Sequence, residues 1–104
     1  MTKYRVIVTS KAKVDIESIF DYIAYDLGAY QAASKLYDRI TDAILSLSYF
    51  PYRIKAMNDT FDFGDVRKLS VDNYSVLFIV KNDTVIVTNV LYSSSNIEKM
   101  LHRQ

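Results

Sequence analysis

The sequence contains no cysteine and only one histidine, His102, among its 104 residues. Without thiols the chain can form neither a disulfide bridge nor a thiolate zinc site, and a single imidazole is too few for a histidine zinc cluster. The sequence also has no glycine-rich phosphate loop and no acidic residues at a spacing typical of metal sites. We therefore expect neither a metal nor a cofactor.

Long apolar runs and a strong excess of one charge are also missing. No apolar run approaches the roughly 20 residues that a membrane-spanning helix needs. The first ten residues, MTKYRVIVTS, become polar too early for a signal peptide, so we expect a cytoplasmic protein. Thirteen Lys and Arg residues against twelve Asp and Glu give a formal charge of +1. This balance weakens the case for a nucleic-acid-binding domain without excluding one.

Residues that break regular structure are scarce, with two glycines and one proline in the whole chain. Half of the residues are hydrophobic and 13% are aromatic, which is enough to build one core in a chain of this length. The sequence shows no internal repeat, low-complexity tract or linker. Residues 1–104 are therefore expected to form a single domain.

The first half of the chain predicts a strand followed by a helix. Residues 4–9, YRVIVT, alternate and are rich in β-branched side chains, as in a strand. Ser10 then offers a helix N-cap, and Gly28 stands where a helix C-terminus favours a positive φ angle. Between them an apolar stripe recurs at helical spacing. Its members are Ile16, Ile19, Phe20, Ile23 and Leu27.

A second apolar stripe predicts a longer helix over residues 30–48, which Pro51 ends. The stripe consists of Ala33, Leu36, Tyr37, Ile40, Ala43, Ile44 and Leu47. Because the connection between the two helices is short, we expect them to form a helical hairpin.

The second half predicts a three-stranded antiparallel meander. Strands are expected at residues 66–70, 74–80 and 84–92, separated by the turns VDN and KND. Residues 52–65 show no clean period and are expected to form a loop. With the N-terminal strand and the helical hairpin, this order predicts an α+β fold in which the hairpin covers one face of a sheet.

The serines after the last strand have a local structural explanation. Ser95, with Glu98 three residues later, is a capping box. It predicts a short C-terminal helix whose apolar side chains are Ile97, Met100 and Leu101.

Two of the predicted strands carry apolar side chains on both faces. In residues 74–80, Tyr74, Val76, Phe78 and Val80 alternate with Leu77 and Ile79; in residues 84–92 we group Val85, Val87 and Leu91 against Ile86 and Val90. A single hairpin and a short helix are too small to cover both faces. Either an apolar groove stays open for a partner, or the 52–65 loop folds back over it, and the sequence favours neither.

Two long segments, DIESIFDYIAYDLGAYQAASKLYDRITDAILSLSYFP and VRKLSVDNYSVLFIVKNDTVIVTNVLYSSSNIEKML, together resemble the RelE/ParE superfamily of type II toxins. The similarity spans nearly the whole chain and rests on the order and spacing of packing and turn residues. The recurring positions are Asp15, Ile16, Ile19, Tyr22, Ile23, Ala24, Ala33, Ile40, Leu47, Pro51, Arg67, Leu69 and Tyr74. The helical part is more similar to the ParE-like, plasmid-stabilisation branch than to the ribonuclease branch.

The resemblance implies a toxin that a cognate antitoxin neutralises, and for the ParE branch it implies DNA gyrase as the target. Such a toxin would bind a protein and needs no catalytic residue. Exposed apolar sheet and hairpin surface is what a flexible antitoxin tail can wrap and cover.

The resemblance also implies an alternative, a ribosome-dependent endoribonuclease that cuts messenger RNA. That chemistry needs a general acid, a general base and cations around the phosphate. Members that cut RNA present a basic residue after the last strand, where this chain has Ser93, Ser94, Ser95 and Asn96. The remaining candidates for an unusual catalytic site are Arg67, Lys55 and His102.

For a surface that binds the target or the antitoxin, the candidates are Arg53, Arg67, Tyr92 and Ser94. Tyrosine and arginine are enriched at protein interfaces, where they act as anchors. Because Arg67 and Lys68 are neighbours on a predicted strand, they point to opposite faces and only one of them can line a given site. The resemblance favours Arg67.

Overall fold

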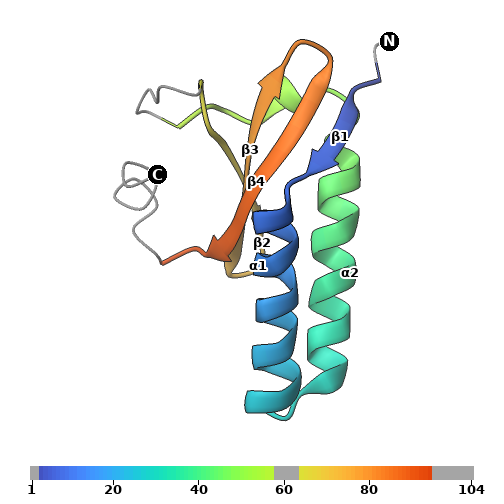
Figure 1. Ribbon diagram of the computed structural model, residues 1–104, viewed down its shortest axis with the longest axis vertical. Coiled ribbons are helices and arrows are strands. Elements are labelled where there is room, and N and C mark those ends of the chain that lie inside the picture. The colour runs from blue at the N-terminus through green and yellow to red at the C-terminus, as the bar shows by residue number, and fades with distance from the viewer. Residues whose placement is uncertain (1–2, 58–63, 95–104) are drawn as a thin grey trace.

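The computed structural model describes residues 3–57 and 64–94, and shows two helices packed on one face of a four-stranded sheet (Figure 1). The elements are β1 (Arg5–Val8), α1 (Ser10–Asp21), the π-helical turn η1 (Tyr22–Asp26), α2 (Tyr30–Ser46), the 3-10 turn η2 (Pro51–Arg53), β2 (Arg67–Val71), β3 (Tyr74–Lys81) and β4 (Thr84–Tyr92). The predicted α+β fold, with its N-terminal strand, helical hairpin and meander, is confirmed. The predicted C-terminal helix lies outside the described residues.

The sheet has the strand order β1-β4-β3-β2. β1 runs parallel to β4 and aligns Arg5 with Thr84, whereas β2, β3 and β4 form the antiparallel meander. The two hairpin turns fall where the sequence predicts them, and each contains one residue in the left-handed region, Asp72 (φ 52°) and Asn82 (φ 58°). Asp and Asn tolerate this conformation better than other side chains.

The first helix is capped by Thr9, so the prediction of Ser10 as the N-cap is wrong by one residue. Thr9 is extended (φ −66°, ψ 161°), and its hydroxyl oxygen accepts a hydrogen bond from the Ala12 N–H at 3.1 Å. The same hydroxyl donates to the Thr88 carbonyl of β4 at 3.3 Å. One side chain therefore both starts the helix and joins it to the sheet.

The first helix does not keep its α-helical phase to its end. Residues Tyr22–Asp26 form a π-turn in which the Leu27 N–H donates to the Tyr22 carbonyl. The extra residue in this turn rotates the next residues about the helix axis, so Leu27 is 59% exposed and its assignment to the buried stripe is wrong. Gly28 adopts φ +66°, which confirms it as the residue that ends the helix.

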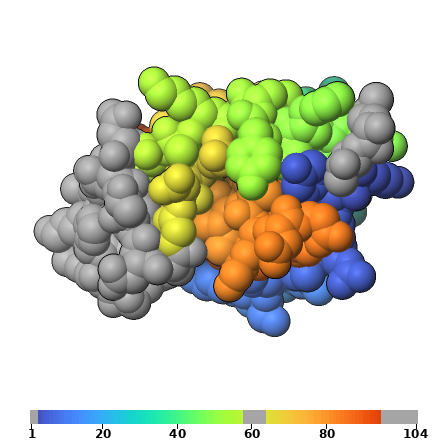
Figure 2. Space-filling model, turned by 90° about the horizontal axis from the view of Figure 1, so that it is seen from above, coloured from blue at the N-terminus to red at the C-terminus, as the bar shows by residue number. Residues whose placement is uncertain are grey.

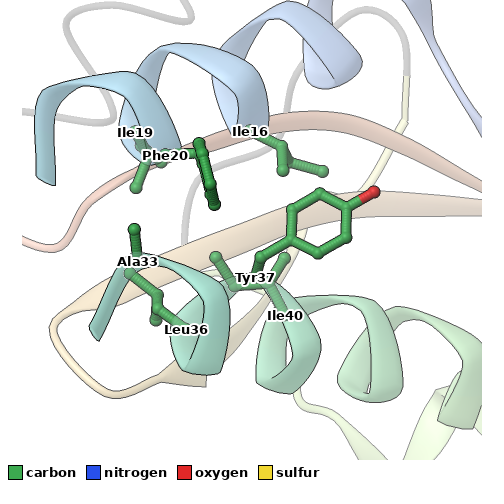
Figure 3. A pocket seen from close by; sticks show the side chains of 7 residues that line it. All are labelled: Ile16, Ile19, Phe20, Ala33, Leu36, Tyr37 and Ile40. Atoms are coloured by element: carbon green, nitrogen blue, oxygen red, sulfur yellow. The ribbon is translucent and has the colours of Figure 1, made fainter. Parts of the chain in front are cut away.

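The two helices meet along an apolar seam (Figure 3), in which Ile16, Ile19 and Phe20 of α1 face four residues of α2. The α2 residues are Ala33, Leu36, Tyr37 and Ile40, and the contact leaves no room for a water molecule. Phe20 also contacts Tyr30 and Tyr37 edge to face. In the part of the chain that the structure describes, no helix is long and apolar enough to cross a membrane.

The main core lies between the helices and the sheet. Ile40, Phe78, Val85 and Val87 are almost fully buried there, together with Ala12, which packs the start of α1 against the strands. Val90 belongs to the same core, whereas Leu91 packs on the opposite face, so the predicted grouping of Leu91 with Val85 and Val87 is wrong.

A β-bulge is the reason for that error. Phe78 pairs with Val87 and Leu77 pairs with Asn89, so Thr88 is an extra residue in β4. One extra residue reverses the alternation of side chains beyond it, because the side-chain period of a strand is two. Sequence alternation alone contains no sign of this reversal.

Beyond the end of β1, the first helix provides a hydrogen-bond partner for the backbone of β4. β1 pairs with β4 only as far as Val87, whose carbonyl accepts from the Thr9 N–H at 3.0 Å. Further along, the Val90 N–H donates to Asp15 Oδ2 at 3.0 Å. Asp15 also forms an ion pair with Lys11. The helix thus supplies the acceptor that a neighbouring strand would supply elsewhere in a sheet.

The face of the sheet opposite the helices, which we call the second face, is partly covered. Leu77 and Val66 are fully buried on it, and Met57, Ile79 and Leu91 pack around them. Met57 belongs to the segment predicted as the 52–65 loop, so the described part of that segment covers one region of the face. Further across the sheet, Ile7 remains 42% exposed.

We predict that Ile40→Ala lowers the free energy of unfolding by about 2 to 5 kcal/mol, because it removes a fully buried side chain from the core. Tyr25→Ala, at a position that is 68% exposed, should cost less than about 0.5 kcal/mol. Denaturant titration of both variants measures the difference. Equal losses would mean that the assigned faces of the helices are wrong.

We also predict that Asp15→Ala costs about 1 to 3 kcal/mol, because it leaves the buried Val90 N–H without an acceptor. Asp15→Asn retains an acceptor oxygen and should recover part of the loss. Glu17→Ala, an exposed carboxylate on the same helix, is the matched control and should change stability by no more than about 0.5 kcal/mol. Thermal unfolding of the three variants provides the comparison, and an Asp15→Ala variant as stable as Glu17→Ala would contradict this role.

Candidate functional site

The predicted site residues lie in two separate regions of the molecule. Arg53 and Arg67 lie near η2, at the end of the molecule where α2 stops and β1 begins. Tyr92 and Ser94 lie at the far end of β4, where Tyr92 pairs with Tyr74. The structure therefore does not bring these four residues together into one site.

Arg67 lies on the helix-covered face of the sheet and is occupied by internal contacts. It pairs with Phe78, a core residue of that face, and its Nη1 donates to the Ile54 carbonyl at 2.6 Å. Its guanidinium carbon lies 4.7 Å from the centre of the Tyr52 ring, a cation–π contact. Lys68 pairs with Leu77, a residue of the second face, as expected for adjacent strand residues.

Arg53 closes the C-terminal end of α2. Its Nη1 donates to the carbonyls of Tyr49 at 2.6 Å and Phe50 at 3.1 Å, and its Nη2 donates to the Ser46 hydroxyl at 3.1 Å. These bonds tie η2 to the last residue of α2 and to the turn that follows it. Of the other two ribonuclease candidates, Lys55 is exposed and His102 lies outside the described residues.

Around these arginines lies a surface that the sequence patterns did not predict, which we call the basic aromatic surface. It consists of Tyr4, Tyr49, Phe50, Tyr52 and Arg53. A concavity of about 520 Å³ is lined by all of these residues except Tyr49. The rings of Tyr4 and Tyr52 meet edge to face with their centres 6.2 Å apart, and Lys3 Nζ lies 5.9 Å from the centre of the Tyr49 ring. The segment SYFPYR, three aromatic residues around a proline, was the available signal.

Tyr92 belongs to a second concavity, which we call the tyrosine groove. It has a volume of about 430 Å³ and is lined by Tyr22, Ile23, Leu27, Tyr74 and Tyr92. The rings of Tyr74 and Tyr92 meet edge to face at 5.5 Å. Burial raises the pKa of the Tyr74 phenol, and the neighbouring phenols of Tyr92 and Tyr22 raise it further. Tyr74 therefore remains a neutral hydrogen-bond donor at physiological pH.

Ser93, the first of the serines after β4, has a structural role. The Ser93 N–H donates to the Asn73 carbonyl at 2.8 Å, and the hydroxyls of Ser93 and the buried Ser75 are hydrogen-bonded at 2.9 Å. These bonds tie the end of β4 to the β2–β3 turn and to β3. Ser94 is exposed, and Ser95 lies outside the described residues.

Metal-binding side chains do not gather in the described ranges. Within residues 3–57 and 64–94, no group of three or more His, Cys, Asp or Glu side chains is placed to hold a metal ion. The side chains that line the two concavities supply tyrosine hydroxyls and apolar surface, and Arg53 adds guanidinium N–H groups to the first of them.

Comparison with solved structures finds the same fold in toxin–antitoxin systems. A chain of the chromosomal ParDE TA system from P. aeruginosa is 20% identical with a TM-score of 0.72, and the match covers 86% of this chain and 96% of that chain. The toxin–antitoxin complex RelBE2 from Mycobacterium tuberculosis matches at 15% identity and a TM-score of 0.64, over 88% and 99% of the two chains. The archaeal RelE–RelB complex from Pyrococcus horikoshii OT3 matches at 13% identity and 0.63, over 89% and 98%.

Comparison with curated proteins gives no significant match. A family model, described as the ParE toxin of the type II toxin–antitoxin system parDE, matches residues 6–97. This range includes all of the described helices and nearly all of the sheet. The chain therefore belongs to the ParE toxin family of type II toxin–antitoxin systems.

Proposed function

We propose that this ParE-family toxin acts in the cytoplasm by binding and inhibiting DNA gyrase, and that a cognate antitoxin neutralises it by binding. The observation that carries this proposal is the placement of Arg67. Arg67 is the strand arginine that would belong to a ribonuclease site by resemblance. Here it lies on the helix-covered face, donates a hydrogen bond to the Ile54 carbonyl and stacks on the Tyr52 ring.

RNA cleavage would require a different arrangement of side chains. Attack by a ribose 2′-hydroxyl needs a general base, a general acid for the leaving oxygen and cations that stabilise the charge on the phosphate. Arg53 and Arg67 direct N–H groups at backbone carbonyls, and the position after β4 holds serines, which are neutral. These observations favour binding over catalysis.

The exposed tyrosines support a protein-binding mode of action. Both concavities combine tyrosine rings with other apolar side chains, which is the composition of anchor sites at protein interfaces. We propose that Tyr92 and Ser94 contact the antitoxin or the target directly. Arg53 and Arg67 contribute by holding the basic aromatic surface in shape.

A cognate antitoxin is supported by the kind of structures that share the fold. The matching structure from Mycobacterium tuberculosis is a toxin–antitoxin complex, and the one from Pyrococcus horikoshii OT3 is a RelE–RelB complex. The partly exposed Ile7 on the second face and the tyrosine groove offer apolar area that a flexible antitoxin segment can cover.

We predict that co-expression with its cognate antitoxin, which we expect to be encoded beside it, gives a complex that melts at a higher temperature than the toxin alone. A partner at about 100 times its Kd adds about 2.7 kcal/mol to stability, which corresponds to roughly 10 °C or more for a domain of this size. Differential scanning fluorimetry measures the shift. An unchanged melting temperature in the presence of the partner would count against a specific complex.

We predict that the purified toxin inhibits supercoiling by DNA gyrase and leaves messenger RNA uncut during translation in vitro. Ser94→Arg, which adds the cation found in the ribonuclease branch, should leave toxicity unchanged or weaken it. Ser18→Arg, at an exposed position in α1, is the matched control for the added charge. Cuts within codons on the ribosome that appear or increase with Ser94→Arg would establish the ribonuclease alternative instead.

A further inference from the structure

Three large aromatic side chains next to Pro51 remain outside the core. Tyr49, Phe50 and Tyr52 are all exposed, and Phe50 is 60% exposed at the rim of the concavity. Figure 2 views the molecule onto this end, where the green segment around residue 50 adjoins the blue of β1, the orange of the β3–β4 hairpin and the yellow of β2. Clustered apolar exposure of this kind marks an interaction surface more often than a structural feature.

Phe50, whose ring lies at the rim of the concavity, has a strained backbone conformation. Phe50 is in the left-handed region (φ 49°, ψ 55°) and directly precedes Pro51, where helical conformations are disfavoured. Asn or Gly would adopt this conformation at lower cost. Arg53 fixes the strained turn by donating to the carbonyls of Tyr49 and Phe50. Strain that neighbouring contacts maintain is common at binding sites.

The charges of the molecule are separated although its formal charge is only +1. Among the described residues, the segments that meet at this end, 3–5, 48–57, 64–67 and 81–83, carry six cations against two acids, Asp65 and Asp83. The cations are Lys3, Arg5, Arg53, Lys55, Arg67 and Lys81. In the helical hairpin, residues 10–46, acids outnumber cations by six to four. The described residues around the basic aromatic surface therefore carry an excess of positive charge that the overall charge conceals.

We infer that the basic aromatic surface docks an acidic segment of the toxin's protein target, with one apolar side chain of that segment in the concavity. This inference rests on the proposed action by protein binding. Carboxylates of the segment would face the cations around the rim, and charge complementarity would orient the encounter. The concavity of about 520 Å³ accommodates an anchoring side chain and its neighbours, and the fixed turn lowers the entropic cost of binding.

The same features argue against the two other occupants. Single-stranded RNA would stack its bases on open aromatic faces, but Arg67 lies over the Tyr52 ring and Lys3 over the Tyr49 ring. A wrapping antitoxin tail gains affinity from long apolar surface, whereas this surface is short, rigid and basic.

The test is Phe50→Asn, which removes the ring and places at φ 49° a residue that tolerates it. We expect an unchanged or slightly higher melting temperature and an antitoxin affinity within about twofold of wild type. Toxicity should fall, so that at least about tenfold more cells form colonies after induction than with the wild-type toxin. Tyr25→Asn, which replaces a 68% exposed aromatic residue on η1, should keep full toxicity. Lys55→Glu should slow association with the target and weaken toxicity in the same direction.

Full growth arrest by Phe50→Asn would overturn the inference. A parallel loss of antitoxin affinity would reassign the surface to the antitoxin, and binding of a short oligouridylate that depends on Phe50 would reassign it to RNA. A wild-type toxin that arrests growth without inhibiting gyrase refutes gyrase as the target. In that case the comparison of growth arrest by wild type and Phe50→Asn still tests whether the basic aromatic surface docks a protein target. A wild type that does not arrest growth refutes both.

Discussion

The position of the helical hairpin on the sheet depends on two polar side chains of the α1 region and the strand they bind. The Thr9 hydroxyl donates to the carbonyl of Thr88, the bulge residue of β4, and Asp15 accepts from the Val90 N–H two residues further along the strand. β4 is an inner strand with β1 and β3 as neighbours. Because α2 packs on α1, these bonds also help to position α2, the η2 turn that follows it, and the tyrosine groove.

Much of the architecture results from local pattern. Short-range preferences determine the apolar stripes, the end of the first helix at Gly28 and the turns at Asp72 and Asn82. These features appear in the structure almost where the sequence predicts them. The cap at Thr9, the π-turn and the bulge at Thr88 are different. The Thr9 hydroxyl also bonds to β4, and the bulge arises in the pairing of β3 with β4, so no window of local sequence contains these two contacts. The π-turn shifts the helical phase by one residue, and the apolar spacing of the sequence does not show this shift.

The sequence offered candidate site residues but not their arrangement in space. The sequence offers tyrosines and arginines as candidate functional side chains, and the structure places Tyr92 in the lining of a concavity. The alternation rule correctly separates Arg67 from Lys68, but it cannot say which of the two faces carries the helices. The sequence did not single out Phe50, because its left-handed backbone angle, φ 49°, is not one that the residue type indicates for phenylalanine.

The π-turn gives the tyrosine groove a dependence on chain length. A π-turn contains one residue more than the α-helix it interrupts, and it can arise from a single insertion. Deleting one residue within Tyr22–Asp26 would restore a continuous α-helix and rotate Leu27 away from its exposed position. One wall of the groove would then be lost while the helix itself became more regular. Related toxins that differ here by one residue would share the fold and present a different surface to their partners.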